Sequence, residues 1–191
     1  MPLPSRKADL VATAARVFAE RGYHATTIDH LVEASGLTRG GLYHYIDGKH
    51  DLLIAVQQEL LNPLLERARD VVAASDDPES QLRALTREWV EHAASHRDHM
   101  IVFAAERRTV ESDPRWDEIR AARDEFEALL DGIFRRGEET GQFATTDRSL
   151  ALLAFLGMVN HMPSWFDPRG RLSAAEVADR FCDLLLGGVR A

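Results

Sequence analysis

The sequence predicts an all-α protein: a three-helix N-terminal domain of the helix-turn-helix type, then a C-terminal helical domain, with about nine helices in total. The first observation is residues 26–49, T-T-I-D-H-L-V-E-A-S-G-L-T-R-G-G-L-Y-H-Y-I-D-G-K, where two short helical patterns meet at a Ser-Gly turn. The second is the rest of the chain, where apolar residues recur at helical spacing and no alternating strand pattern appears. We therefore expect two domains, residues 1–50 and residues 51–191.

The first two helices are predicted from apolar periodicity and from their end signals. The opening helix presents one apolar face before a stop at Arg21-Gly22, and that face consists of Leu10, Val11, Ala14, Val17 and Phe18. Thr26 is the expected N-cap of the second helix, with Asp29 three residues on to close a capping box. This helix is predicted to end at Ser35-Gly36, because Gly36 can adopt the left-handed backbone of the turn.

The third helix has the character of a DNA-reading element. Thr38 is its expected cap, and Gly40-Gly41 leave its start without bulk, so that it can approach base edges closely. The aromatic residues and the lysine that follow have spacings suited to phosphates. The expected DNA-contacting set is Thr26, Thr27, Thr38, Arg39, Gly40, Gly41, Tyr43, His44, Tyr45 and Lys49. The alternative is that the glycines form an ordinary turn and the tyrosines belong to the core.

The remaining chain divides into six helical segments. They are predicted near residues 49–74, 79–95, 97–110, 114–140, 148–161 and 174–190. Asp113-Pro114 and Asp147 are expected N-caps, and Ser173 with Glu176 forms a capping box. Pro63 lies inside the first of these segments.

Composition limits the class of protein. The chain has no apolar run long enough to cross a membrane and no basic-then-apolar signal segment, so a cytoplasmic location is expected. Its single cysteine, Cys182, excludes an internal disulfide framework. Residues 1–50 carry six Lys/Arg against five Asp/Glu, or +1, whereas the remainder carries 17 against 26, or −9. DNA therefore repels the C-terminal part far more than the N-terminal part.

About residues 6–53 resemble a known family. A-A-R-V-F-A-E-R-G-Y-H-A-T-T-I and G-L-T-R-G-G-L-Y-H-Y-I-D-G-K are similar to the N-terminal domain of the TetR family of transcriptional regulators. Gly41 and Ile46 depart from the residues usual there, which are Thr, Ser or Ala and Phe respectively. The resemblance implies a ligand-responsive repressor that binds a palindromic operator as a homodimer. The alternative within this class is a regulator of an efflux or detoxification gene that responds to a drug-like apolar ligand.

The last two predicted helices are the expected dimer interface, since small residues allow close helix approach and the resemblance implies a four-helix bundle there. The face consists of Leu150, Leu153, Ala154, Gly157, Met158 and His161 on one helix and Val177, Phe181, Leu184, Leu185 and Gly188 on the other. An intramolecular core face is the alternative.

The C-terminal region further resembles TetR-type ligand domains that respond to acyl-coenzyme A thioesters, chiefly through W-F-x-P-x-G-x-L-S-x-x-E at residues 165–176. An acyl chain needs an apolar channel, and the phosphates of the coenzyme need arginines. The candidate ligand-binding residues are Phe103, Arg107, Arg108, Phe126, Leu130, Phe134, Phe155, Met158, His161, Met162, Trp165 and Arg169. Each also has an ordinary structural explanation, as core aromatic or solvated arginine.

Two other kinds of protein fit the sequence less well. The group His92, His96, Asp98 and His99 could place metal ligands on one helix, although a break near Ser95 interrupts it, so no metal is expected. An enzyme acting on coenzyme A thioesters is a more distant alternative, because the sequence lacks a G-x-S-x-G elbow, a phosphate-binding glycine loop and H-E-x-x-H. We expect a binding protein without a cofactor.

Overall fold

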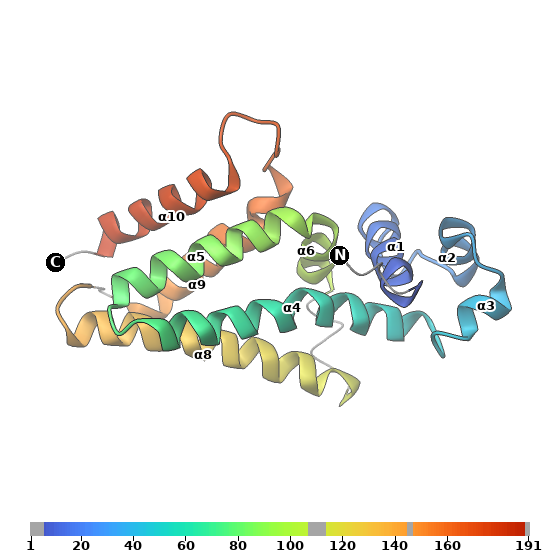
Figure 1. Ribbon diagram of the computed structural model, residues 1–191, viewed down its shortest axis with the longest axis horizontal. Helices are drawn as coiled ribbons and strands as arrows, with labels where there is room; N and C mark the ends of the chain where they lie inside the picture. The colour runs from blue at the N-terminus through green and yellow to red at the C-terminus, as the bar shows by residue number, and fades with distance from the viewer. Residues whose placement is uncertain (1–5, 107–113, 145–146, 190–191) are drawn as a thin grey trace. The chain divides into compact units, whose positions relative to one another are not determined.

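The prediction of an all-α fold is confirmed. The computed structural model describes residues 6–106, 114–144 and 147–189, and in these ranges it contains nine α-helices, two short 3₁₀ helices and no strand. The chain forms two compact units: unit 1 is Met1–Leu61 with Asp98–Arg120, and unit 2 is Asn62–Arg97 with Ala121–Ala191. Figure 1 labels the helices along the chain. No helix in the described ranges is long and apolar enough to span a membrane.

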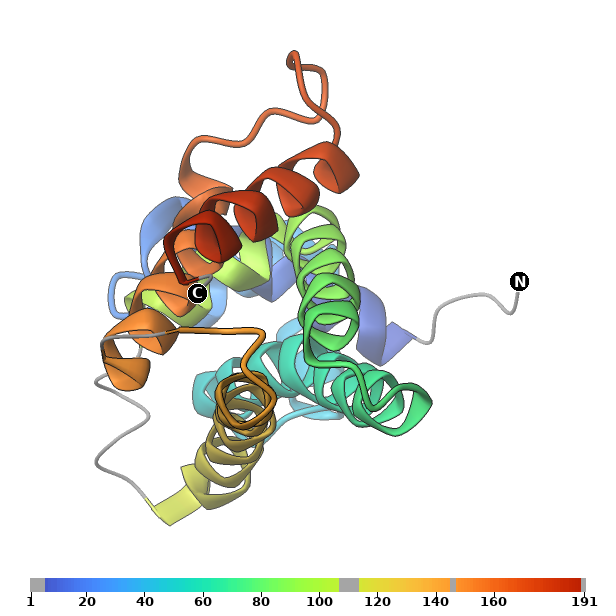
Figure 2. The same ribbon diagram turned by 90° about the vertical axis from the view of Figure 1, so that its left-hand side faces the viewer.

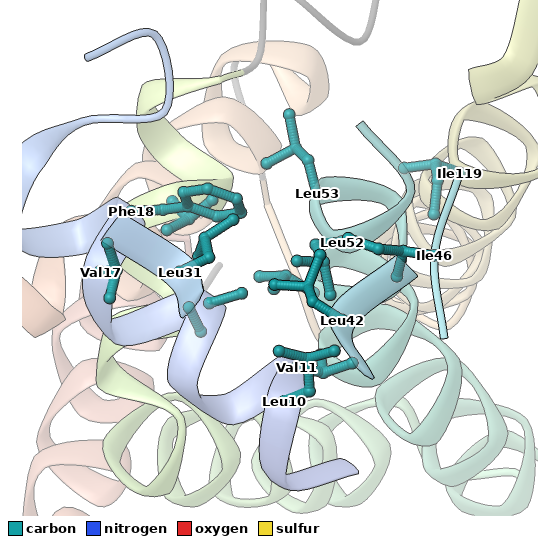
Figure 3. Close-up of a cluster of buried hydrophobic side chains, with 14 of the residues drawn as sticks. Leu10, Val11, Val17, Phe18, Leu31, Leu42, Ile46, Leu52, Leu53 and Ile119 are labelled. Atoms are coloured by element: carbon teal, nitrogen blue, oxygen red, sulfur yellow. The ribbon is translucent and has the colours of Figure 1, made fainter. Parts of the chain in front are cut away.

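Unit 1 is built on the three predicted N-terminal helices. They are α1 (Arg6–Arg21), α2 (Ile28–Ser35) and α3 (Arg39–Tyr43), and the unit also holds the first half of α4 (Lys49–Ala74), most of α6 (Arg97–Ala105) and η1 (Pro114–Trp116). Figure 3 shows apolar side chains from α1, α2, α3 and α4 meeting in one core. The predicted face of α1 is buried there, with Leu10, Val11 and Phe18 at most 2% exposed. Packing in this core positions α2 and α3 relative to α1 and α4.

The N-cap of α2 is a correction to the sequence prediction. Thr27, not Thr26, caps the helix, and His30, not Asp29, closes the capping box by accepting a hydrogen bond from Thr27 N at 3.3 Å. Thr26 is buried and its hydroxyl donates to the Gly22 carbonyl at 2.8 Å, so this oxygen serves the preceding turn. Two adjacent threonines offer equal caps locally, and the tertiary fold selects between them.

Unit 2 contains α5 (Pro78–Ser95), α9 (Arg148–His161), η2 (Met162–Ser164), α10 (Ala174–Val189) and most of α8 (Asp117–Glu139). The helix α10 packs along α5 and touches α9, and Figure 2 shows these three helices of the unit together. Two ion pairs reinforce the packing of α10 on α5: Arg83–Asp183 at 3.0 Å and Arg87–Asp179 at 2.7 Å. Unit 2 therefore has a packed core of its own.

Most predicted helix ends are confirmed. Asp147 caps α9 by accepting from Leu150 N at 3.0 Å, and Ser173 and Glu176 form the expected reciprocal capping box. Gly36 ends α2 in the left-handed conformation with φ of 66°. The segment predicted from residue 114 begins as the 3₁₀ turn η1, and α8 proper starts only at Asp117. The expected cap Asp113 and the end of the segment predicted to residue 110 lie outside the described residues.

The units do not divide the chain at residue 50. Helix α4 runs without a break through Pro63 and contributes Lys49–Leu61 to unit 1 and Asn62–Ala74 to unit 2. A proline inside a helix removes one main-chain hydrogen bond and favours a bend at that turn. The assignment of DNA binding to residues 1–50 and of ligand binding and dimerisation to residues 51–191 stays a prediction.

Candidate DNA-binding and effector-binding sites

Helix α3 is held from both sides. At its start Thr38 accepts a hydrogen bond from Gly41 N at 3.0 Å, which confirms the predicted cap. On the inner side Leu42 is fully buried in the core of unit 1. Because Gly40 and Gly41 carry no side chains, Arg39 and Tyr43 are the residues of this helix that present large polar side chains to solvent. A short, rigidly seated helix with such an outer face can be placed against a DNA groove.

The two glycines of α3 differ in the space around them. A Cβ atom on Gly40 would have no heavy atom within 4 Å, whereas one on Gly41 would lie 3.1 Å from the Thr38 hydroxyl oxygen. A residue larger than glycine at position 41 would therefore press on the cap. The glycine at position 41 is compatible with a tight cap at the start of α3.

The aromatic residues after α3 are exposed to different degrees. Tyr43 is 46% exposed, and His44 is exposed at the end of the helix. Tyr45 is half-buried against the core of unit 1, with its ring 5.3 Å from that of His44 in an edge-to-face arrangement. Among the three, Tyr43 and His44 are the ones available to a nucleic acid.

Lys49 is committed to the protein itself. Its ammonium group donates to the main-chain carbonyls of Tyr23 and Thr26, both at 2.7 Å, and lies 4.3 Å from the centre of the Tyr23 ring. Burial lowers the pKa of Lys49, and the negative charge of Glu106 opposes that change. Two of the three ammonium donors therefore join the start of α4 to the turn between α1 and α2.

Two ion pairs of unit 1 were not anticipated from the sequence. Arg39 Nη1 lies 3.4 Å from Asp29 Oδ1, which connects α3 to α2. The buried Glu106 carboxylate lies 3.5 Å from His24 Nε2. Helical spacing has no signal for either pair, because each joins residues of different elements.

Unit 2 brings three of the predicted ligand-binding residues together. The ring of Trp89 on α5 meets Phe126 of α8 at 4.9 Å and Phe155 of α9 at 5.8 Å, edge to face in both cases. Phe134 lies 6.5 Å from Phe155 and 5.9 Å from Phe143. All five side chains are at most 5% exposed. Trp89 and Phe143 are not among the ligand-binding residues predicted from the sequence, yet both rings belong to this cluster.

The other predicted ligand-binding residues are more dispersed. Leu130 and Met162 are buried in unit 2, Met158 is half-buried and His161 is exposed. Trp165 is 52% exposed, with its ring 6.1 Å from that of Phe181.

The remaining candidates lie at the surface, in the other unit or outside the description. The side chain of Arg169 is 95% exposed and lies 3.9 Å from Asp167. Phe103 belongs to unit 1, where it packs against that core. Arg107 and Arg108 lie outside the described residues.

Helices α9 and α10 carry an exposed apolar surface. Leu150, Leu153 and Leu184 are 63%, 62% and 70% exposed, three of the five exposed large apolar side chains in the described ranges. In contrast, Val177 and Leu185 of the expected interface are buried within the protomer. They belong to the intramolecular core, because α10 also packs on α5.

The histidines considered as metal ligands belong to two different units. The rings of His92 and His96 in unit 2 are tilted by 35° with their centres 4.1 Å apart, whereas His99 belongs to unit 1, with its Nε2 atom 3.5 Å from Glu59 Oε2. Among the residues that the structure describes, no group of three or more His, Cys, Asp or Glu is arranged to hold a metal ion.

Comparisons with known proteins match both parts of the chain. Residues 10–56 match the model of the bacterial regulatory proteins of the tetR family, and residues 75–189 match that of the tetracyclin repressor-like C-terminal domain. The chain is 27% identical over 186 residues to the HTH-type transcriptional repressor KstR2 of Mycobacterium tuberculosis, covering 97% of this chain and 93% of the relative.

Solved structures agree with these matches. The ketosteroid transcriptional regulator KstR2 of Mycobacterium tuberculosis superposes with a TM-score of 0.92 at 26% identity, covering 99% of this chain and 97% of the other. AibR, in complex with isovaleryl coenzyme A and operator DNA, superposes with a TM-score of 0.84 at 27% identity, covering 95% of this chain and 98% of the other.

Proposed function

The chain belongs to the TetR family of bacterial regulatory proteins, and we propose that it is a dimeric repressor released from a near-palindromic operator by an acyl-coenzyme A thioester. The observation that carries the DNA-binding part is the seating of α3, capped by Thr38 and anchored by Leu42, with Arg39 and Tyr43 on its outer face. Since its target is genomic DNA, the protein acts in the cytoplasm.

The predicted DNA contacts divide into two roles. Thr27, Thr38, Arg39, Tyr43 and His44 are exposed and can touch bases or phosphates directly. The other predicted residues support these contacts. Gly40 and Gly41 allow α3 to approach the DNA closely, and the contacts of Thr26, Tyr45 and Lys49 within unit 1 hold its helices in place. A third donor of the Lys49 ammonium group remains for a phosphate.

The exposed leucines of α9 and α10 support dimerisation through these helices. Three such side chains on neighbouring helices form a surface that water covers poorly, and burial against a second copy would remove it from solvent. Exposed Ala154, Gly157 and Gly187 allow close helix approach, since no heavy atom lies within 4 Å of a Cβ built on either glycine. A dimer would place two recognition helices on successive turns of one face of the DNA.

The aromatic cluster supports an apolar effector. Trp89, Phe126, Phe134 and Phe155 come from three helices of unit 2 and form an apolar interior suited to an acyl chain. The arginines Arg107, Arg108 and Arg169 are the candidates for the phosphates of the coenzyme. The structural relative AibR supports this class, because its complex holds isovaleryl coenzyme A together with operator DNA.

Helix α4 supplies the connection between effector and operator. Its C-terminal half belongs to unit 2 and its N-terminal half, beginning at Lys49, to unit 1. An effector that prefers one position of the C-terminal half would shift the population of positions of the N-terminal half, and with it the separation of the two recognition helices in a dimer. Release of DNA follows when that separation no longer fits two successive major grooves.

Two experiments test this proposal. Selection from a randomised duplex library should enrich an inverted repeat whose half-sites are about 34–36 Å apart, or a multiple of that; enrichment of no sequence would contradict operator binding. Calorimetry with short-, medium- and long-chain acyl-coenzyme A should give one stoichiometric binding event, with the thioester recovered intact. Hydrolysis of the thioester would indicate an enzyme, and binding of drug-like apolar compounds alone would favour the efflux-regulator alternative.

A further inference from the structure

Arg39 is the only long cation available on the recognition helix. The sequence has no other Lys or Arg between Arg21 and Lys49, and two donors of the Lys49 ammonium group are already bound to main-chain carbonyls. The neighbouring positions Gly40 and Gly41 offer no side chain. Whatever charge-assisted contact α3 makes with DNA therefore depends on Arg39.

The guanidinium of Arg39 has an acidic partner on the neighbouring helix. Its Nη1 atom lies 3.4 Å from Oδ1 of Asp29, in the first turn of α2, and the two side chains are 62% and 73% exposed. An exposed pair of this kind contributes little to folding. A carboxylate beside a helix that binds DNA is also unfavourable for binding to any DNA, because its negative charge repels the phosphates. Any effect of the pair is therefore expected in DNA binding rather than in folding stability.

A carboxylate partner changes which DNA contacts Arg39 can make. A guanidinium has five N–H donors in a planar fork, so it can keep the ion pair with Asp29 and offer other donors to a guanine edge. A phosphate contact that draws the side chain away would break the pair and leave the Asp29 carboxylate without its cation. The pair thus penalises complexes on unselected DNA more than the complex on the preferred base.

We propose that Asp29 is a positioning residue that sets the sequence selectivity of DNA binding by holding Arg39 in its base-reading position. This inference rests on the proposed DNA-binding function of α3. It assigns to an acidic residue of α2 a specificity role that works against affinity, as is common where discrimination is built from repulsion.

The test compares Asp29→Asn with Glu33→Gln. Glu33 is exposed on the same helix one turn later, so both variants remove one negative charge from α2. Dissociation constants are measured for the duplex selected from the random library and for a scrambled duplex of equal composition, at matched salt. Asp29→Asn should tighten binding to the scrambled duplex more than to the selected one, lowering the affinity ratio about 2- to 5-fold, the range of an exposed ion pair. Glu33→Gln should leave the ratio unchanged.

The Arg39→Ala background separates positioning from charge. There, adding Asp29→Asn should no longer change the ratio, because no guanidinium remains to be held. An unchanged ratio for Asp29→Asn in the wild-type background, or an equal fall in the Arg39→Ala background, would overturn the inference. Failure of the proposed function itself would look different: the wild-type protein would enrich no sequence. Thermal unfolding followed by circular dichroism checks that each variant is folded.

Discussion

Leu153 provides the sharpest test of the proposed dimer. It is 62% exposed on α9, and burying a leucine side chain completely is favourable by about 1.5–3 kcal/mol, so covering the remaining exposed part is favourable by about 1–2 kcal/mol. In a two-fold interface each substitution occurs twice. Leu153→Ser should therefore weaken association by about 2–4 kcal/mol, which raises the dimer dissociation constant about 30- to 1000-fold.

Sedimentation equilibrium over a range of protein concentrations measures this constant directly. Leu184→Ser, on α10, should have an effect of similar size, since Leu184 is 70% exposed. Tyr43→Ser is the matched control, because Tyr43 is also an exposed large side chain but lies on α3 of unit 1. If the dissociation constant of Leu153→Ser equals that of wild type, or if wild type sediments as a monomer at micromolar concentration, this reasoning is refuted.

Three further predictions concern single side chains. Lys49→Ala loses two charge-assisted hydrogen bonds to main-chain carbonyls, so chemical denaturation should show a free energy of unfolding about 1–3 kcal/mol lower, with weaker binding to all DNA. Gly137→Ala should also destabilise, by about 1–3 kcal/mol, because a Cβ there would overlap the Phe143 ring; an unchanged melting curve would contradict this packing. Burial raises the pKa of the Cys182 thiol, so iodoacetamide should label it slowly in the native state and rapidly after unfolding. Since the folded protein holds this proton more tightly, the thiol's contribution to stability is present below its ordinary pKa of about 8.5 and is lost as the pH rises above that value.

Local signals allowed the helix ends to be predicted. The cap at Thr38, the cap at Asp147 and the Ser173–Glu176 box each depend on residues within three positions of one another, and all three form as expected. The choice of Thr27 over Thr26 was missed because it depends on the Gly22 carbonyl, which the fold brings to the Thr26 hydroxyl.

The periodicity of apolar residues could not predict contacts between residues that are far apart in the sequence. Lys49 binds carbonyls more than 20 residues earlier in the chain, and Trp89 joins aromatic residues of α8 and α9. The pattern around each residue indicates only that it is near a helix start or on a buried face. Helix α10 has one face packed within the protomer and one exposed face, and this division likewise depends on its packing against α5. The two helices are far apart in the sequence: Arg83 of α5 binds Asp183 of α10, 100 residues later.

The most direct test of the whole account is fluorescence anisotropy of the purified protein on the DNA upstream of its own gene, titrated with acyl-coenzyme A thioesters of increasing chain length and with free coenzyme A. We predict a stable complex that thioesters of one length class dissociate, while free coenzyme A leaves it intact. A complex that no thioester disturbs would contradict the acyl-coenzyme A proposal and leave the operator-binding role standing. Failure to form any complex with that DNA or with the selected repeat would contradict the central claim.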